Sequence, residues 1–279
     1  MKDSHFIPHW QLDGAGSIGR IGVLTPDFDP VPESEMWAMA PPGVSIHASR
    51  VPWNRITRSF AEPPHVDTAT ELLAGLTPHV IVYAFTGSSY VLSAEADDSL
   101  RARLENRARG IPVVLTAPAA SEALRVLGVH RLALIHPPWF SEEVNADGRD
   151  YFGSRGMEVV YCARMTPARS FTEVPPAEVY AWTKANVPQD AEGVFIGGNG
   201  LRAIGVIQAL EDSLGRPVLT ANQVAFWQAL RVVGMTSEVS QYGRIFTEGP
   251  PNSRLERTGS TPAAQPGSWA AQSTFGGMR

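Results

Sequence analysis

Three titratable side chains stand beside short apolar runs of the sequence. Asp27 and Asp29 follow the run GVLTP, and His136 ends the run RLALIH. A carboxyl group that is partly removed from water can act as a general base, and histidine exchanges protons readily near neutral pH. Asp29, His136 and Asp27 are therefore our candidate catalytic residues. The alternatives are that Asp27 caps a turn beside Pro26 and that His136 is a hydrogen-bonded structural histidine.

A run of hydroxyl groups follows another apolar segment. The segment VIVYAF leads directly into Thr86, Gly87, Ser88 and Ser89. Successive backbone N–H and hydroxyl donors in a turn can neutralise an anion without a lysine or arginine. We therefore expect these four residues to bind an anionic substrate group, with simple capping of the turn as the alternative.

A glycine-rich stretch follows a third apolar segment, GVFI. It reads GGNG and includes Gly198, Asn199 and Gly200. Glycine lets the backbone approach a ligand closely, so these three residues are further candidates for substrate binding. A tight turn into a helix is the alternative explanation for the same glycines.

The candidate residues occur at matching places in an internal repeat. The segment RIGVLTP resembles RLALIHP, and VIVYAFTG resembles VFIGGNG. Arg131 lies 111 residues after Arg20, and Gly198 lies 113 residues after Phe85. Two pairs of similar segments at nearly the same separation indicate an internal duplication. The repeat pairs Phe85 with Gly198.

The elements that must position these residues are short strands alternating with helices. The runs VIVYA, PVVL, RLALI, EVVY, GVFI and RPVL are short and continuously apolar, which is typical of parallel strands buried on both faces. We therefore expect an α/β fold of two pseudo-symmetric lobes, each with a parallel sheet. Ligands bind beyond the carboxyl ends of such strands, so the candidate residues would share a cleft between the lobes.

The repeat and the composition together suggest four parts of the chain. We expect an N-terminal arm at 1–18 and a first lobe made of 19–118 plus 221–248. A second lobe would occupy 119–220. The last stretch, 249–279, is rich in Gly, Pro, Ser and Ala and would form a flexible tail.

Composition excludes several function classes. The net charge of −5, without a basic stripe, argues against nucleic acid as a partner. No apolar run reaches the roughly 20 residues of a membrane span, and the N-terminal stretch lacks the apolar segment of a signal peptide. Cys162 is the one cysteine, which excludes an internal disulfide and a thiolate metal site and favours a cytoplasmic location. We expect Cys162 to be a buried structural thiol and the protein to need no metal or cofactor.

Longer stretches carry a resemblance to a known family. They include RIGVLTPDFDPVPESEMW, VIVYAFTGSS and GVFIGGNGLRAIGVIQALEDSLGRPVLTANQVAFWQALR. From about residue 20 to 246 the chain resembles the aspartate/glutamate racemase superfamily, in particular its maleate cis-trans isomerase and arylmalonate decarboxylase branch. The resemblance implies the two-lobed fold, a carboxylate-binding role for the stretch from Thr86, and a homodimer. It also implies two cysteines on opposite faces of the substrate, at positions that Phe85 and Gly198 occupy here.

Other departures from the family pattern suggest a different pocket. Asp29 stands where the family often has an asparagine, and Phe140, or its neighbour Trp139, stands near a family tyrosine that contacts substrate carboxylate. A bulky Phe85 opposite an empty Gly198 favours an asymmetric, apolar pocket and a larger or aromatic substrate. Our first hypothesis is an enzyme that acts on a small carboxylate or carbonyl compound by cysteine-independent proton transfer or lyase-type chemistry. The alternatives are an inactive carboxylate-binding protein, and a hydrolase or cyclase that uses Asp27 or Asp29.

Overall fold

The structure is a computed structural model. It describes residues 14–53, 60–92, 94–167, 173–235 and 239–248. The expected flexible tail at 249–279 lies outside the described residues, as does most of the expected N-terminal arm.

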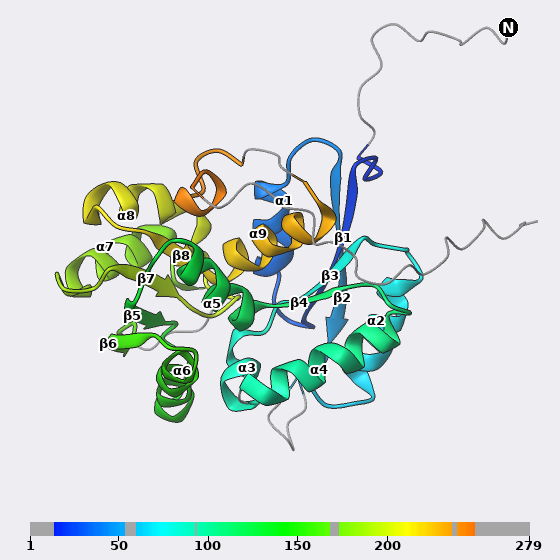
Figure 1. The fold of residues 1–279 in the computed structure, drawn as a ribbon, viewed down its shortest axis with the longest axis horizontal. Helices are drawn as coiled ribbons and strands as arrows, with labels where there is room; N and C mark the ends of the chain where they lie inside the picture. Colours follow the sequence, from blue (N-terminus) through cyan, green and yellow to red (C-terminus); the bar gives the residue numbers. More distant parts are fainter. Residues whose placement is uncertain (1–13, 54–59, 93, 168–172, 236–238, 249–279) are drawn as a thin grey trace, which may run out of the picture.

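Two four-stranded parallel sheets form the centre of the described chain (Figure 1). The first sheet has the strand order β2-β1-β3-β4, and the second has the order β6-β5-β7-β8. The strands are β1 (Gly19–Pro26), β2 (Val44–Val51), β3 (Val80–Tyr83), β4 (Val113–Leu115), β5 (Arg131–His136), β6 (Glu158–Arg164), β7 (Gly193–Ile196) and β8 (Val218–Thr220). Both sheets follow the same path along the chain, which confirms the predicted α/β fold and internal duplication.

The continuously apolar runs form strands because both faces of each sheet are covered. Every residue of β3, β4, β7 and β8 is buried. Parallel strands need crossover connections, and helices supply these connections here. The helices are α1 (Val31–Met39), α2 (His65–Ala74), α3 (Thr86–Leu92), α4 (Ala94–Arg107), α5 (Thr116–Val126), α6 (Glu142–Ser154), α7 (Pro176–Asn186), α8 (Ile207–Leu214) and α9 (Ala221–Val233), with short 3₁₀ turns η2 (Ile204–Val206) and η3 (Arg244–Phe246).

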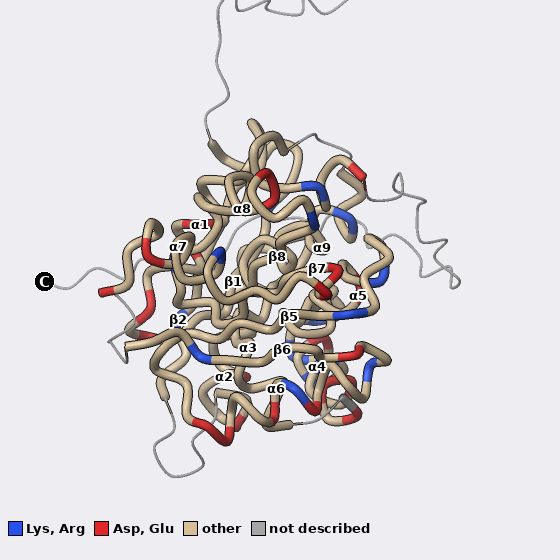
Figure 2. Tube along the Cα trace, turned by 90° about the vertical axis from the view of Figure 1, so that its left-hand side faces the viewer, with Lys and Arg blue, Asp and Glu red and all other residues tan. Residues whose placement is uncertain are grey.

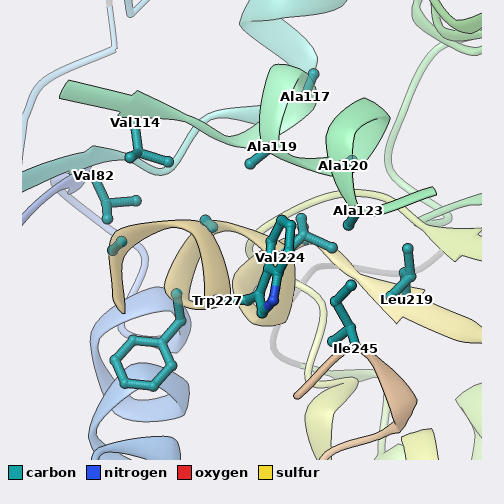
Figure 3. Close-up of a cluster of buried hydrophobic side chains, with 14 of the residues drawn as sticks. Val82, Val114, Ala117, Ala119, Ala120, Ala123, Leu219, Val224, Trp227 and Ile245 are labelled. Atoms are coloured by element: carbon teal, nitrogen blue, oxygen red, sulfur yellow. The ribbon is translucent and has the colours of Figure 1, made fainter. Parts of the chain in front are cut away.

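Helix α9 joins the two halves. It packs against α1, β3 and β4 of the first half and against β8 of the second, and also against α5. Figure 3 shows Val224 and Trp227 of α9 in one apolar cluster with Val82 and Val114 on one side and Leu219 on the other. The two sheets therefore share part of their core through this helix, which holds the ends of their strands in a fixed relation.

The stretch from Thr86 to Ser89 differs from the expected loop, because it is the beginning of helix α3. The helix starts three residues after β3 ends, with a side chain from the other half at its N-terminus. The backbone N–H and the hydroxyl of Thr86 both donate to Oδ1 of Asn199, at 2.8 Å and 2.6 Å. A side-chain oxygen on the first N–H groups of a helix is the usual N-terminal capping interaction.

Charged residues are distributed over many elements. Figure 2 shows Lys and Arg, in blue, on several helices and loops that also carry Asp and Glu, in red. Within the described residues, no helix combines the length and the apolar character that crossing a membrane requires.

Candidate active site

A cavity of about 520 Å³ lies where strands of both sheets end. Its walls come from the segments after β1, β2, β3, β5 and β7, at the strand ends where the sequence placed the cleft. The structure brings nine of the candidate residues to these walls: Asp29, Phe85, Thr86, Gly87, Ser88, Phe140, Gly198, Asn199 and Gly200. Asp27, Ser89 and His136 do not line the cavity.

Aromatic side chains dominate the cavity. Phe28, Trp53, Phe60 and Phe85 line it from the first half, and Trp139 and Phe140 line it from the second. The ring centroid of Phe60 lies 4.6 Å from those of both Trp53 and Phe85, so these three rings form a continuous wall. Such a surface favours a ligand with an aromatic or bulky apolar part.

Phe85 is part of this wall and also part of the core. It is buried, and its ring centroid lies 4.4 Å from that of Tyr83. The rings of Trp53 and Phe60 were not found from the sequence. They belong to the connection after β2, which carries no polar cluster at a strand end to mark it.

Asp29 is the one titratable side chain among the described residues that line the cavity. Its Oδ1 accepts a hydrogen bond from the N–H of Val31 at 2.9 Å, at the start of α1. No described residue donates to Oδ2. Burial raises the pKa of Asp29 to about 6, against smaller opposing effects of the Val31 N–H and the Arg50 guanidinium. A carboxyl group with this pKa can carry a proton near neutral pH.

The segment that holds Asp29 is itself fixed from β2. Nη1 of Arg50 donates to the backbone oxygen of Asp29 at 2.6 Å, and Nη2 forms an ion pair with Glu33 at 2.7 Å. Arg50 therefore stabilises the β1–α1 connection and does not line the cavity.

Asn199 links the two halves at the cavity wall. Its Oδ1 accepts both donors of Thr86, and its Nδ2 donates to Thr116 Oγ1 at 3.2 Å and to Asn222 Oδ1 at 2.9 Å. Both the N–H and the hydroxyl of Thr86 therefore donate to Asn199, so they do not donate to a substrate as the sequence predicted. Gly87 and Ser88, in the same turn, remain the candidates for holding an anion.

A buried carboxylate that the sequence did not reveal stands behind Asn199. Glu35 of α1 accepts hydrogen bonds from the N–H groups of Ala203 and Ile204, at 2.8 Å and 3.1 Å, and from Nδ2 of Asn222 at 2.7 Å. Burial raises the pKa of Glu35 to about 7, although these three donors lower it. In the sequence it looks like an ordinary helix glutamate in PESEMW.

His136 lies in the interior and not at the cavity. One ring nitrogen, Nδ1, is 2.9 Å from Asn145 Oδ1, and the other, Nε2, is 3.3 Å from the hydroxyl of Tyr90. Burial lowers the pKa of His136 to about 4, against the opposing effect of its bond with Asn145. A neutral histidine with both nitrogens engaged is suited to holding α3 and α6 against β5, which corrects our expectation of a proton carrier.

Replacing His136 by glutamine should change how stability depends on pH. Histidine in the unfolded chain takes up a proton below about pH 6.5, whereas folded His136 stays neutral until about pH 4. The free energy of unfolding of the native protein therefore falls by up to about 3 kcal/mol over this pH range. Because His136→Gln has no histidine at this position, its stability relative to the native protein should increase as the pH falls. Urea unfolding of both proteins at pH 7 and pH 4 measures the difference, and parallel pH profiles would contradict it.

Asp27 and Ser89 do not line the cavity either. Asp27 is exposed, and its backbone N–H donates to the oxygen of Val51 at 3.1 Å. Ser89 is fully buried beside Asp97 on the other side of α3. The helical geometry explains this placement, because successive residues of a helix turn by about 100° and cannot all face one ligand.

Gly198 sits in a backbone conformation that its neighbours require. Its φ of +86° is in the left-handed region, and a β-carbon added there would lie 2.6 Å from Cγ of Pro137. A residue with a side chain would therefore be strained and would also collide with Pro137. This position is shaped for glycine by the turn after β5.

The thiol of Cys162 is also away from the cavity. It lies on β6, 3.4 Å from the backbone oxygen of Asn145, and burial raises its pKa to about 11. A thiol with a raised pKa is a poor nucleophile near neutral pH. Within the described residues, no group of three or more His, Cys, Asp or Glu side chains is arranged to hold a metal ion.

Comparison with known proteins places the chain in a family. A family model described as arylmalonate decarboxylase matches residues 57–246, which is more than half of the chain. The chain belongs to the arylmalonate decarboxylase family. One relative in the arylmalonate decarboxylase family is the arylmalonate decarboxylase of Bordetella bronchiseptica, which is 28% identical over 149 residues. That match covers 50% of this chain and 60% of the relative, so it spans less than two thirds of the relative's length.

Solved structures of arylmalonate decarboxylases and maleate isomerases share the fold. A maleate isomerase from Pseudomonas putida S16, solved with maleate, has a TM-score of 0.73 at 19% identity, over 82% of this chain and 98% of its own. A Nocardia farcinica maleate cis-trans isomerase with a covalently bound succinylcysteine intermediate has a TM-score of 0.72 at 20% identity, over 83% and 99%. An arylmalonate decarboxylase mutant in a liganded form has a TM-score of 0.72 at 22% identity, over 83% of this chain and 100% of its own. These structural similarities confirm the predicted fold, and the family model confirms the predicted resemblance to arylmalonate decarboxylases.

Proposed function

We propose that this protein is a decarboxylase of the arylmalonate type, which removes one carboxylate from a small acid that carries an aromatic or bulky apolar group. The observation that carries the proposal is the position of Asp29 in a cavity walled by aromatic rings, as a carboxyl group with a raised pKa whose Oδ2 accepts no hydrogen bond from a described residue. The family membership supports the reaction class.

The cavity offers different surroundings to the two ends of such a substrate. In the first turn of α3, Gly87 can donate to one carboxylate through its backbone N–H and Ser88 through its hydroxyl, whereas the N–H of Ser88 already donates to the backbone oxygen of Phe85 at 3.2 Å. The aromatic wall of Trp53, Phe60 and Phe85 would take the apolar group. A second carboxylate would then lie against apolar surface, where the loss of its hydration favours its departure as CO₂.

The chemical step needs one proton and no cysteine. The bond between the α-carbon and the leaving carboxylate breaks, CO₂ departs, and the electron pair forms an enediolate on the retained carboxylate. The protonated carboxyl of Asp29 then gives its proton to the α-carbon and recovers one from water. An anionic substrate raises the pKa of Asp29 further by charge repulsion, which favours its acid form in the complex.

A thiol-based mechanism has less support. The Nocardia farcinica isomerase is described with a succinylcysteine intermediate. In this chain the resemblance aligns Phe85 and Gly198 with the family's cysteine positions, and Cys162 does not line the cavity. These observations favour decarboxylation over isomerisation through a thiol adduct.

Incubation with phenylmalonate and, separately, with maleate tests the proposal. We expect phenylacetate and CO₂ to form from phenylmalonate at a rate well above that in buffer, and maleate to remain unchanged, as followed by NMR. Conversion of maleate to fumarate would favour an isomerase. Binding of phenylacetate without any turnover would favour the inactive binding protein, for which the buried His136 and the exposed Asp27 already provide some support.

Replacing Cys162 by serine should leave the activity within about twofold of the native value, because the thiol contacts Asn145 and not the cavity. The kcat/KM for phenylmalonate measures this. A loss of activity larger than the loss of folded protein would show that the thiol takes part in the chemistry.

A further inference from the structure

The first turn of α3 is held in place by a chain of hydrogen bonds that begins at a buried carboxylate. Glu35, Asn222 and Asn199 are each 8% exposed or less, and they connect α1, α9 and the segment after β7. Asn199 lines the cavity, whereas Glu35 and Asn222 lie behind it. The three side chains join residues that are far apart in the sequence.

The two ends of the chain of hydrogen bonds fix the direction of every amide in it. The N–H of Thr86 can only donate, so the atom of Asn199 that it contacts at 2.8 Å must be the oxygen. The NH₂ group of Asn199 then faces Asn222 at 2.9 Å, which must therefore present its oxygen. The NH₂ group of Asn222 faces Glu35 at 2.7 Å, and this contact requires an acceptor.

The carboxyl group of Glu35 meets that requirement independently. Its Oε1 accepts from two backbone N–H groups, those of Ala203 and Ile204, which can also only donate. The described groups that bond to Glu35 are all donors, so a carboxylate suits the site, whereas an amide would place one NH₂ group against a donor. The second NH₂ contact of Asn222, to the backbone oxygen of Asn199 at 2.8 Å, supports the same orientation.

We propose that Glu35 is a positioning residue for the cavity: through Asn222 it orients the Asn199 amide, which in turn fixes the first turn of α3 and the groups of Gly87 and Ser88. This proposal rests on the proposed function where it concerns substrate, and on the hydrogen-bond geometry where it concerns α3. It assigns a task to a carboxylate that touches no ligand.

The matched control is Glu211, a second buried carboxylate with a similar setting. It is 1% exposed and accepts from the N–H groups of Val218 and Arg244, at 3.1 Å and 3.0 Å. It lies on α8 and forms no hydrogen bond with Asn199, Asn222 or Glu35. Glu35→Gln and Glu211→Gln therefore both replace a buried acceptor of backbone N–H groups, but only the first is connected to the cavity.

Two measurements on the full chain test the proposal. The first is hydrogen–deuterium exchange of the segment that contains Thr86 to Ser89, and the second is the Kd of phenylacetate measured by calorimetry. We expect Glu35→Gln to speed exchange in this segment, and to weaken phenylacetate binding, by about tenfold or more each. Glu211→Gln should change neither at a comparable loss of thermal stability.

Asn222→Ala provides a second variant if Glu35→Gln does not fold, since it breaks the chain and leaves Glu35 bonded to Ala203 and Ile204. It should reproduce the faster exchange at α3. Exchange at α3 that matches Glu211→Gln in both variants would overturn the proposal. If native protein neither binds phenylacetate nor converts phenylmalonate, the proposed function fails, and the exchange measurement still decides the role of Glu35.

Discussion

Replacing Asp29 by asparagine is expected to lower kcat for phenylmalonate by about 10²–10⁴-fold, which is the usual contribution of a positioned proton donor. Asparagine keeps the size of the side chain, and its oxygen can still accept from the N–H of Val31. It has no acidic proton to give to the α-carbon. Steady-state kinetics measure the loss, and calorimetry with phenylacetate should show that the cavity still binds a carboxylate.

The pH dependence of kcat/KM tests the role of Asp29 independently. Asp29 must be protonated to act as an acid, and its pKa is raised to about 6. The kcat/KM of the native protein should therefore fall as the pH rises above about 6, and the residual activity of Asp29→Asn should lack this limb. Asp27→Asn is the control, since Asp27 is exposed and outside the cavity, and should stay within about twofold of native activity. Equal effects of the two substitutions would exclude Asp29 as the proton donor.

Introducing cysteine at position 198 is expected to destabilise the protein by about 2–5 kcal/mol. About 1–2 kcal/mol comes from a side chain at a φ of +86°, and about 1–3 kcal/mol comes from the collision of its β-carbon with Pro137 at 2.6 Å. Urea unfolding measures the change. Gly215→Ala is a suitable control, because Gly215 also has a positive φ, of +67°, but a β-carbon there meets no atom within 4 Å.

The comparison separates the conformational cost from the steric cost. Gly215→Ala should lower the free energy of unfolding by about 1–2 kcal/mol, and Gly198→Cys should lower it clearly more. Similar losses would mean that Pro137 moves aside easily. A large loss at Gly198 would mean that a thiol at this strand end destabilises the protein whichever residue occupies position 85.

The fold could be predicted from the sequence because its signals are local and repeated. Short continuous apolar runs indicate parallel strands, and the 111-residue and 113-residue separations indicate two equivalent halves. The same reasoning located the cavity, since the ends of parallel strands meet at one edge. The positions of Asp29 and Phe85 at the cavity could be predicted because these residues come directly after β1 and β3.

The orientation of individual side chains could not be predicted in the same way. His136 ends β5, as expected, but its ring turns towards Tyr90 and Asn145 because both can bond to it there. Glu35 is buried by donors that lie 168 and 169 residues further along the chain. Trp53 and Phe60 reach the cavity from the connection after β2. Each of these placements depends on contacts distant in sequence, for which a single sequence holds no pattern.

The bonds between Thr86 and Asn199 have a consequence for the order in which the protein folds. Each sheet is built from one continuous part of the chain, so its strands can pair while the other part is still unfolded. The two bonds across 113 residues can form only after both sheets exist, since closing so long a loop costs entropy that few contacts repay early. The cavity wall is therefore expected to be among the last regions to form, and substitutions at Asn199 should accelerate unfolding more than they slow folding.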